Sequence, residues 1–109
     1  MQVVRLMPIP HQSLNVRLDG QYFKLSIYQK GSSIYADAEC SGQDVVRFVP
    51  CLNLTPILRR EYIGTRGNLL FVDTEGADDP YDHSALGTRW QLLYLTDEEF
   101  AAIDELVVR

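Results

Sequence analysis

The chain has 109 residues, of which 46% are hydrophobic and 23% are charged, the composition of one ordinary globular domain. Its formal net charge is −5 and its basic residues are scattered, which disfavours binding to nucleic acid. It contains no apolar run long enough to cross a bilayer and no signal-peptide pattern at its start. We therefore expect a single soluble domain over residues 1–109, with neither nucleic acid nor a membrane as a partner.

The first two strands are indicated by strict alternation of apolar and polar residues. Apolar residues at every second position predict strands over 13–18 and 22–28. Between them lies Asp19-Gly20, a dipeptide that favours the tight turn of a β-hairpin. This part of the chain is therefore predicted to be an antiparallel hairpin.

Two more strands follow, with turns roughly every ten residues. Residues 34–39 alternate in the same way, and the β-branched and aromatic segment 45–49 ends at Pro50. Glycine-containing turns at 30–32 and 41–43 precede these strands. The first half of the chain is thus predicted to be a four-stranded meander.

The second half of the chain is less regular. Residues 57–63 fit either a short strand or one helical turn, and residues 64–67 fit a tight loop bounded by glycines. Residues 68–74 and 90–95 are predicted strands, and 76–87 is the longest irregular stretch.

The N-terminal segment is interpreted as an edge strand within an arm. Val3 to Leu6 form a strand candidate, and Pro8 and Pro10 favour a sheet edge because proline has no backbone N–H to donate. We define residues 1–12 as the N-terminal arm.

The C-terminal segment, residues 96–109, carries the clearest helix signal. Thr96 and Glu99 form a capping box, and the apolar residues that follow recur at helical spacing, which predicts a helix over about 97–105. The elements together predict an all-β fold. It is a small antiparallel β-barrel or sandwich of about seven to eight strands with a short C-terminal helix.

The sequence shows no arrangement typical of an enzyme. His11 and His83 are the only histidines, and neither belongs to a nucleophile, phosphate-loop or dinucleotide motif. Asp78, Asp79, Asp82 and His83 could supply metal ligands, but their spacing is not that of a calcium loop and a solvated loop explains them better. We therefore predict no catalytic residue, no metal and no cofactor.

The two cysteines, Cys40 and Cys51, are too few for a disulfide framework and lack the spacing of a zinc site. We interpret them as free thiols in a reducing compartment. A single bridge between them is the alternative.

Three tyrosines share one side of the predicted hairpins. Tyr22, Tyr28 and Tyr35 alternate opposite the apolar residues of their strands. An open sheet face with such side chains suits a protein interface, because tyrosine combines a large ring with a polar tip. Ordinary cross-strand pairing on an exposed sheet is the main alternative, and stacking of sugars or bases is a further one.

Several short sequence motifs occur along the chain in a recognisable order. They are Pro8-Ile9-Pro10-His11-Gln12, Leu14 to Tyr22, Val46-Arg47-Phe48-Val49-Pro50, Asn53-Leu54, Gly67 to Asp73, Asp79-Pro80-Tyr81-Asp82 and Leu86 to Leu95. Over residues 6–95 this order and spacing resemble the baseplate plug family of contractile-tailed bacteriophages and related prophages.

The resemblance implies a structural protein of the virion, assembled in the host cytoplasm and located in the tail baseplate, without enzymatic activity or cofactor. It implies a place in the central hub near the end of the tail tube, in several copies packed against hub and tube proteins. In such an assembly the arm (1–12) and the loop at 76–87 are the parts that we expect neighbours to order.

The candidate interface residues come from the arm, the tyrosines and the loop. They are Pro8, Pro10, His11, Gln12, Tyr22, Tyr28, Tyr35, Asp79, Tyr81 and Asp82. The competing hypothesis is a small β-barrel module that binds a glycan or a lipid, which would need a concave aromatic site lined by several strands. An enzyme, the third hypothesis, would need a convergent acid–base pair.

Overall fold

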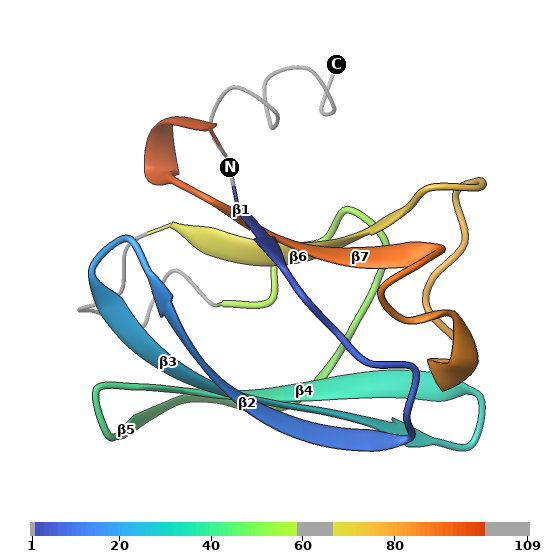
Figure 1. Cartoon of the computed structure of the whole chain (residues 1–109), viewed down its shortest axis with the longest axis horizontal. Helices are drawn as coiled ribbons and strands as arrows, with labels where there is room; N and C mark the ends of the chain where they lie inside the picture. Colours follow the sequence, from blue (N-terminus) through green and yellow to red (C-terminus); the bar gives the residue numbers. More distant parts are fainter. Residues whose placement is uncertain (1, 59–66, 100–109) are drawn as a thin grey trace.

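The computed structural model describes residues 2–58 and 67–99, which form two antiparallel sheets packed face to face (Figure 1). In order, the four-stranded sheet consists of β2 (His11–Leu18), β3 (Gln21–Lys30), β4 (Ser33–Cys40) and β5 (Gln43–Pro50). The three-stranded sheet has the order β1 (Gln2–Val4), β7 (Trp90–Leu95), β6 (Asn68–Asp73). The sheets do not close into a barrel, so the all-β prediction is confirmed in its sandwich form.

Tight turns fix the register of the four-stranded sheet. Asp19-Gly20 and Ser41-Gly42 form two-residue loops, and all four residues have positive φ. Positive φ at both central positions gives the turn whose twist matches that of the flanking strands. The predicted meander is confirmed, and β2 begins at His11 rather than at residue 13 because its pairing with β3 continues to Tyr28.

A β-bulge interrupts the pairing of β4 with β5. Arg47 and Phe48 lie between paired positions of β5 and oppose a single residue of β4, and Phe48 has φ of 54°. Val45 and Val46 are both buried while Arg47 and Phe48 are both exposed. The strand therefore departs from the two-residue period at this point.

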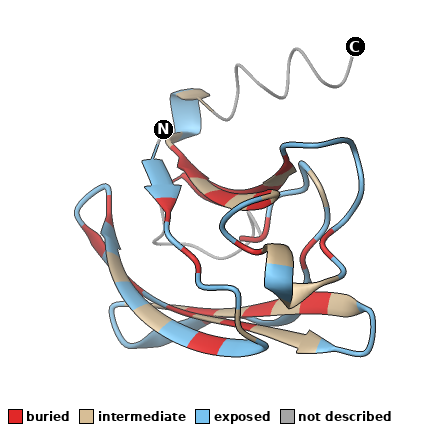
Figure 2. Cartoon of the chain, turned by 45° about the vertical axis from the view of Figure 1, so that its right-hand side comes forward, coloured by how far each residue is buried: buried red, intermediate tan, exposed pale blue. Residues whose placement is uncertain are grey.

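The inner faces of the two sheets share one hydrophobic core (Figure 2). Its largest side chains come from both sheets and include Phe23, Leu25 and Ile27 of β3, Phe71 of β6, and Trp90 and Leu92 of β7. The alternation of apolar residues along β3 places every second side chain in this core.

The chain crosses between the sheets after β5. The backbone N–H of Leu54 donates to Phe71 and that of Ile57 to Leu69, so this connection lies along the outer edge of β6. Ile57 and Leu58 are buried and lie outside any strand. The other residues of the predicted strand or turn at 57–63, and all of the predicted loop at 64–67 except Gly67, lie outside the described residues.

Both ends of the chain follow the sequence prediction as far as they are described. β1 is an edge strand that pairs with β7, starting one residue earlier and ending two residues earlier than the predicted segment 3–6. Residues 97–99 are helical, and Thr96 and Glu99 exchange both hydrogen bonds of the capping box. Residues 100–105 of the predicted helix lie outside the described residues. No helix in the described ranges is long and apolar enough to span a bilayer.

Cys40 and Cys51 are free thiols. Cys51 donates its backbone N–H to Ile34 near the start of β4, whereas Cys40 ends the same strand. Six residues of β-strand span about 20 Å, and a disulfide requires Cα atoms within about 7 Å. The alternative of a bridge between these two cysteines is therefore wrong.

Candidate functional site

The loop before β7 is held by an ion pair within the chain. Arg89 donates from Nε and from one terminal nitrogen to the two carboxylate oxygens of Asp73, at 2.8 Å each, and the Asp73 side chain is fully buried. Asp73 also accepts the backbone N–H groups of Glu75 and Asp78, and Arg89 reaches the Asp78 carboxylate at 2.9 Å. The hydrogen bonds from Arg89 and the backbone hold the pKa of Asp73 well below its usual range.

The predicted interface residues of this loop also have partners inside the chain. Asp79 accepts the backbone N–H of Asn53 at 2.8 Å, and Asp82 caps a short 3₁₀ helix (His83–Ala85) by accepting the N–H of Ser84. Half-exposed Tyr81 sets its ring edge-on to Trp90, with centroids 4.8 Å apart. An interface role for these three residues stays a prediction.

The acidic side chains of the irregular stretch at 76–87 do not converge on one point. Each of Asp78, Asp79 and Asp82 has a different partner, as described above, and His83 donates its backbone N–H to the Gln29 side chain. Within residues 2–58 and 67–99, no three His, Cys, Asp or Glu side chains are grouped so that they could hold a metal ion.

The arm is anchored by a buried glutamine. The Gln12 side chain accepts the N–H of Met7 at 2.9 Å and donates to the carbonyl of Met7 at 2.7 Å, which fixes the bend between β1 and β2. Pro8 and Pro10 are exposed on this bend. Gln12 is thus a structural residue here, whereas the two prolines remain accessible.

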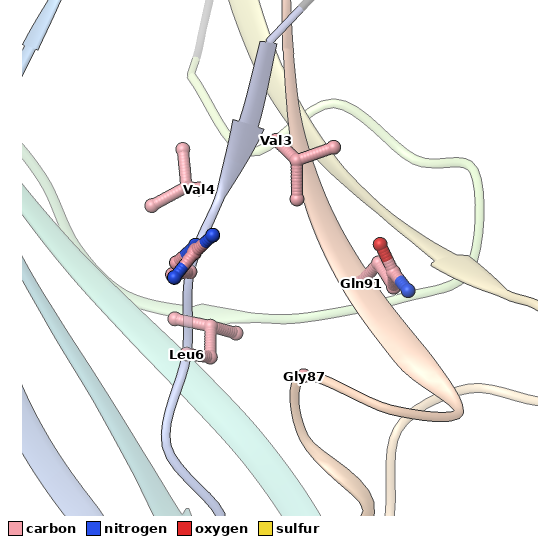
Figure 3. Close-up of a pocket in the computed structure, with 6 residues that line it drawn as sticks. Val3, Val4, Leu6, Gly87 and Gln91 are labelled. Carbon is pink, nitrogen blue, oxygen red and sulfur yellow. The ribbon is translucent and has the colours of Figure 1, made fainter.

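A small pocket of about 290 Å³ lies where the arm passes β7 (Figure 3). Val3, Val4 and Leu6 line it from the arm, and Gly87 and Gln91 line it from the other side. Arg5 also lines it and is the one charged side chain among its lining residues.

Four rings, one from each strand, form a row across one end of the outer face of the four-stranded sheet. His11 of β2, Tyr28 of β3, Tyr35 of β4 and Phe48 of β5 follow one another with centroid separations of 5.8, 6.2 and 4.3 Å. The last two rings are within 8° of parallel. We call these four side chains the aromatic row.

Asp37 lies beside the aromatic row on the same face of the sheet and bonds to two of its residues. Its carboxylate accepts the Tyr28 hydroxyl at 3.0 Å and the backbone N–H of Phe48 at 2.7 Å, and Arg47 donates to it at 3.4 Å. Partial burial and then the hydrogen bond to Asp37 raise the pKa of Tyr28 to about 12. The bulge is therefore tied to β3 and β4 by one carboxylate.

A groove of about 660 Å³ runs beside the row. Its lining residues are Pro10, His11, Ser13, Ser26, Tyr28, Gln29, Lys30 and Asp37. The structure thus brings together three residues predicted from the sequence, Pro10, His11 and Tyr28, and adds Tyr35 by stacking. Tyr22 lies at the opposite end of β3, where the Arg17 guanidinium covers its ring at 4.4 Å.

Sequence reasoning missed Phe48 and Lys30. Lys30 lies at the end of β3 with its amine 5.5 Å from the centre of the Phe48 ring. The signal for Phe48 is the pair of adjacent apolar residues Val45-Val46, which breaks the alternation and indicates a bulge that re-aims the next side chains.

The chain is thus a small β-sandwich. The outer face of its four-stranded sheet carries an exposed row of rings that Asp37 bonds in place. The family model described as "Cyanophage baseplate Pam3 plug gp18" matches residues 1–98. No curated protein matches the chain. The chain belongs to this cyanophage baseplate plug family, which confirms the resemblance seen in the sequence. Membership of this family supports a structural role in a phage tail baseplate.

Proposed function

We propose that the chain is a non-enzymatic plug in the central hub of the baseplate, near the end of the tail tube, where it packs against hub and tail-tube proteins. The match of a baseplate plug family to residues 1–98 carries this proposal. The chain acts as a single domain over residues 1–109 and is assembled in the host cytoplasm before it enters the virion.

Open strand edges support a role that depends on neighbours. The outer edges of β1, β2 and β5 have no strand partner among the described residues, whereas the outer edge of β6 is covered by the connection after β5. Unpaired backbone groups at an edge readily accept a strand from another chain. Repeated copies that meet through unlike surfaces close into a ring when their rotation allows it, which suits a hub with several copies.

The structural use of the polar side chains supports the absence of catalysis. Arg89 and Asp73 form the most strongly bonded charged pair of the described chain, and both serve to hold the loop before β7. The groove residues Gln29 and Asp37 are likewise bonded to neighbours inside the chain. The proposed plug therefore works through shape and contacts.

This proposed function can be tested by mutating the gene in a phage or prophage that encodes the chain. A nonsense mutation should abolish complete contractile tails, as counted by electron microscopy, and the wild-type chain supplied in trans should restore them. Cross-linking and mass spectrometry of purified tails should join the chain to hub and tail-tube proteins. Normal numbers of infectious particles without the chain, or cross-links confined to the outer baseplate, would contradict the proposal.

A further inference from the structure

We propose that the aromatic row and its groove are the docking surface for an acidic protein segment of another baseplate or tail component. This inference deepens the proposed function, on which it rests, by naming the chemistry of a partner. It is carried by the geometry of Phe48, the charge of this face and two lysines beside the groove.

The backbone at Phe48 is held in an unfavourable conformation to present an exposed ring. Phe48 has φ of 54° and its side chain is 53% exposed, so it does not fill the core. The left-handed region is unfavourable for a non-glycine residue, and such strain concentrates at sites with a function. The bulge places the ring 4.3 Å from Tyr35, which extends the row to the edge strand.

The charge of this face differs in sign from that of the rest of the chain. Its charged side chains are Arg17, Lys24, Lys30 and Arg47, against Asp37, Glu39 and Asp44. The face thus has one net positive charge, whereas the whole chain has −5. An acidic partner is attracted to this face and repelled by the remainder of the molecule.

Two of these basic side chains line the grooves without an ion pair in the described part of the chain. Arg47 is already bonded to Asp37, Glu39 and Asp44, at 3.4, 3.2 and 2.6 Å. Lys24 and Lys30 form no ion pair within the described part of the chain. Lys30 lines the groove of about 660 Å³, and Lys24 lines a smaller groove that shares Ser13, Ser26 and Asp37 with it. The amines therefore flank one continuous depression.

The groove favours a polypeptide over a sugar. A sugar site needs polar groups with free hydrogen-bonding capacity that fix the hydroxyls. Asp37 already accepts from Tyr28, Phe48 and Arg47, and the Gln29 side chain already bonds to Gly31 and His83. The hydroxyls of Ser13 and Ser26 bond to each other at 3.1 Å. The stacked rings and the two amines suit a segment that presents apolar or proline side chains together with carboxylates.

Binding of defined peptides tests the proposal. The probes are overlapping synthetic peptides that cover the hub and tail-tube proteins encoded in the same phage or prophage, with the full chain as the binder. Peptides that carry carboxylates beside aromatic or proline residues should bind, and added salt should weaken them. The double variant K24E/K30E should lose affinity by about tenfold or more, as should Phe48→Ala.

The matched control is R5E/R17E, which changes the net charge by the same amount. Arg5 lies outside this face, and Arg17 lies at its far end over Tyr22 and lines neither groove, so most of the affinity should remain. All four lysine and arginine positions are exposed, so these variants should stay folded. Lys24 lies opposite Glu39 and Arg17 covers the Tyr22 ring, so the melting temperature of each variant is measured beside its affinity. Equal losses in the two double variants, or a preference for basic peptides, would overturn the inference. A saturable glycan-array signal that K24E/K30E abolishes would also overturn it, in favour of a glycan-binding module.

The two proposals fail separately. If a nonsense mutation abolishes tails but no acidic peptide binds the groove, the plug function stands and the docking surface is wrong. If acidic peptides bind as expected but tails assemble normally without the chain, the surface stands and the structural role is wrong.

Discussion

Arg89 joins the buried carboxylate of Asp73 through two hydrogen bonds of 2.8 Å, while its guanidinium lies 4.6 Å from the centre of the Trp90 ring. Trp90 in turn donates its indole N–H to the carbonyl of Asp78. The start and end of the loop between β6 and β7 are thus fixed by the side chains of Asp73, at the end of β6, and of Arg89 and Trp90, where β7 begins. The chain itself supplies bonds that hold this loop, and the sequence-based expectation that neighbours order it stays a prediction.

We predict that Asp73→Asn destabilises the chain much more than Asp44→Asn. Asp73 is fully buried and holds Arg89 and two backbone N–H groups, whereas Asp44 forms an exposed pair with Arg47. Removal of one partner from a buried pair leaves an uncompensated charge, while exposed pairs contribute little. Urea unfolding of both variants measures the difference, and equal midpoints would show that the ion pair is not structural.

The ion pair of Asp73 and Arg89 also predicts how the free energy of unfolding depends on pH. The pKa of Asp73 is lower in the folded chain than its unfolded value of about 3.9. Above about pH 5 the carboxylate is ionised in both states and contributes its full stabilisation. As the pH falls below this value the unfolded chain takes up the proton first, so stability declines. Urea midpoints at descending pH should fall more steeply for the wild type than for Asp73→Asn, and parallel curves would contradict the assignment.

The sequence predicted what local patterns determine. Alternation located β2 to β4, apolar composition located β5 and β6, and Asp19-Gly20 identified the first hairpin, because these signals depend only on neighbouring residues. The pairing of Asp73 with Arg89 joins positions far apart in sequence, and no local pattern reports it. Three members of the aromatic row, His11, Tyr28 and Tyr35, were candidates from the sequence. Phe48 was missed because it reaches the face through a bulge.

Gly87 should be far less tolerant of substitution than Gly42. Both have φ of 85°, so alanine at either position costs about 1–2 kcal/mol for the backbone conformation alone. A Cβ at Gly42 would meet no atom within 4 Å, whereas a Cβ at Gly87 would collide with the carbonyl of Leu6. Gly87→Ala should therefore cost roughly 1–3 kcal/mol more than Gly42→Ala. Hydrogen exchange should also show β1 released from β7 in this variant only, and equal unfolding free energies would contradict the contact.

Substitution of two phenylalanines should distinguish a side chain that stabilises the fold from one that serves binding. Phe71 is fully buried in the shared core, and Phe71→Ala should cost about 3–5 kcal/mol of unfolding free energy. Phe48 is exposed and stacks on Tyr35, so Phe48→Ala should cost only about 1 kcal/mol. Chemical denaturation measures both. A loss of several kcal/mol at Phe48 would mean that the ring stabilises the sheet rather than serving a partner.

The two thiols should differ in reactivity in the native chain. Cys51 is buried, and this burial raises the pKa of its thiol above the ordinary value, so little thiolate forms and reagents cannot reach it. Cys40 is only partly buried at the end of β4. Ellman's reagent should therefore react with Cys51→Ser, which keeps Cys40, far faster than with Cys40→Ser, and the two rates should converge in urea. A fast native reaction of Cys40→Ser, or an oxidised intramolecular bridge in the wild type, would show that the segment after β5 leaves the core. Because that segment passes from one sheet to the other, such opening would expose the shared interior of the sandwich.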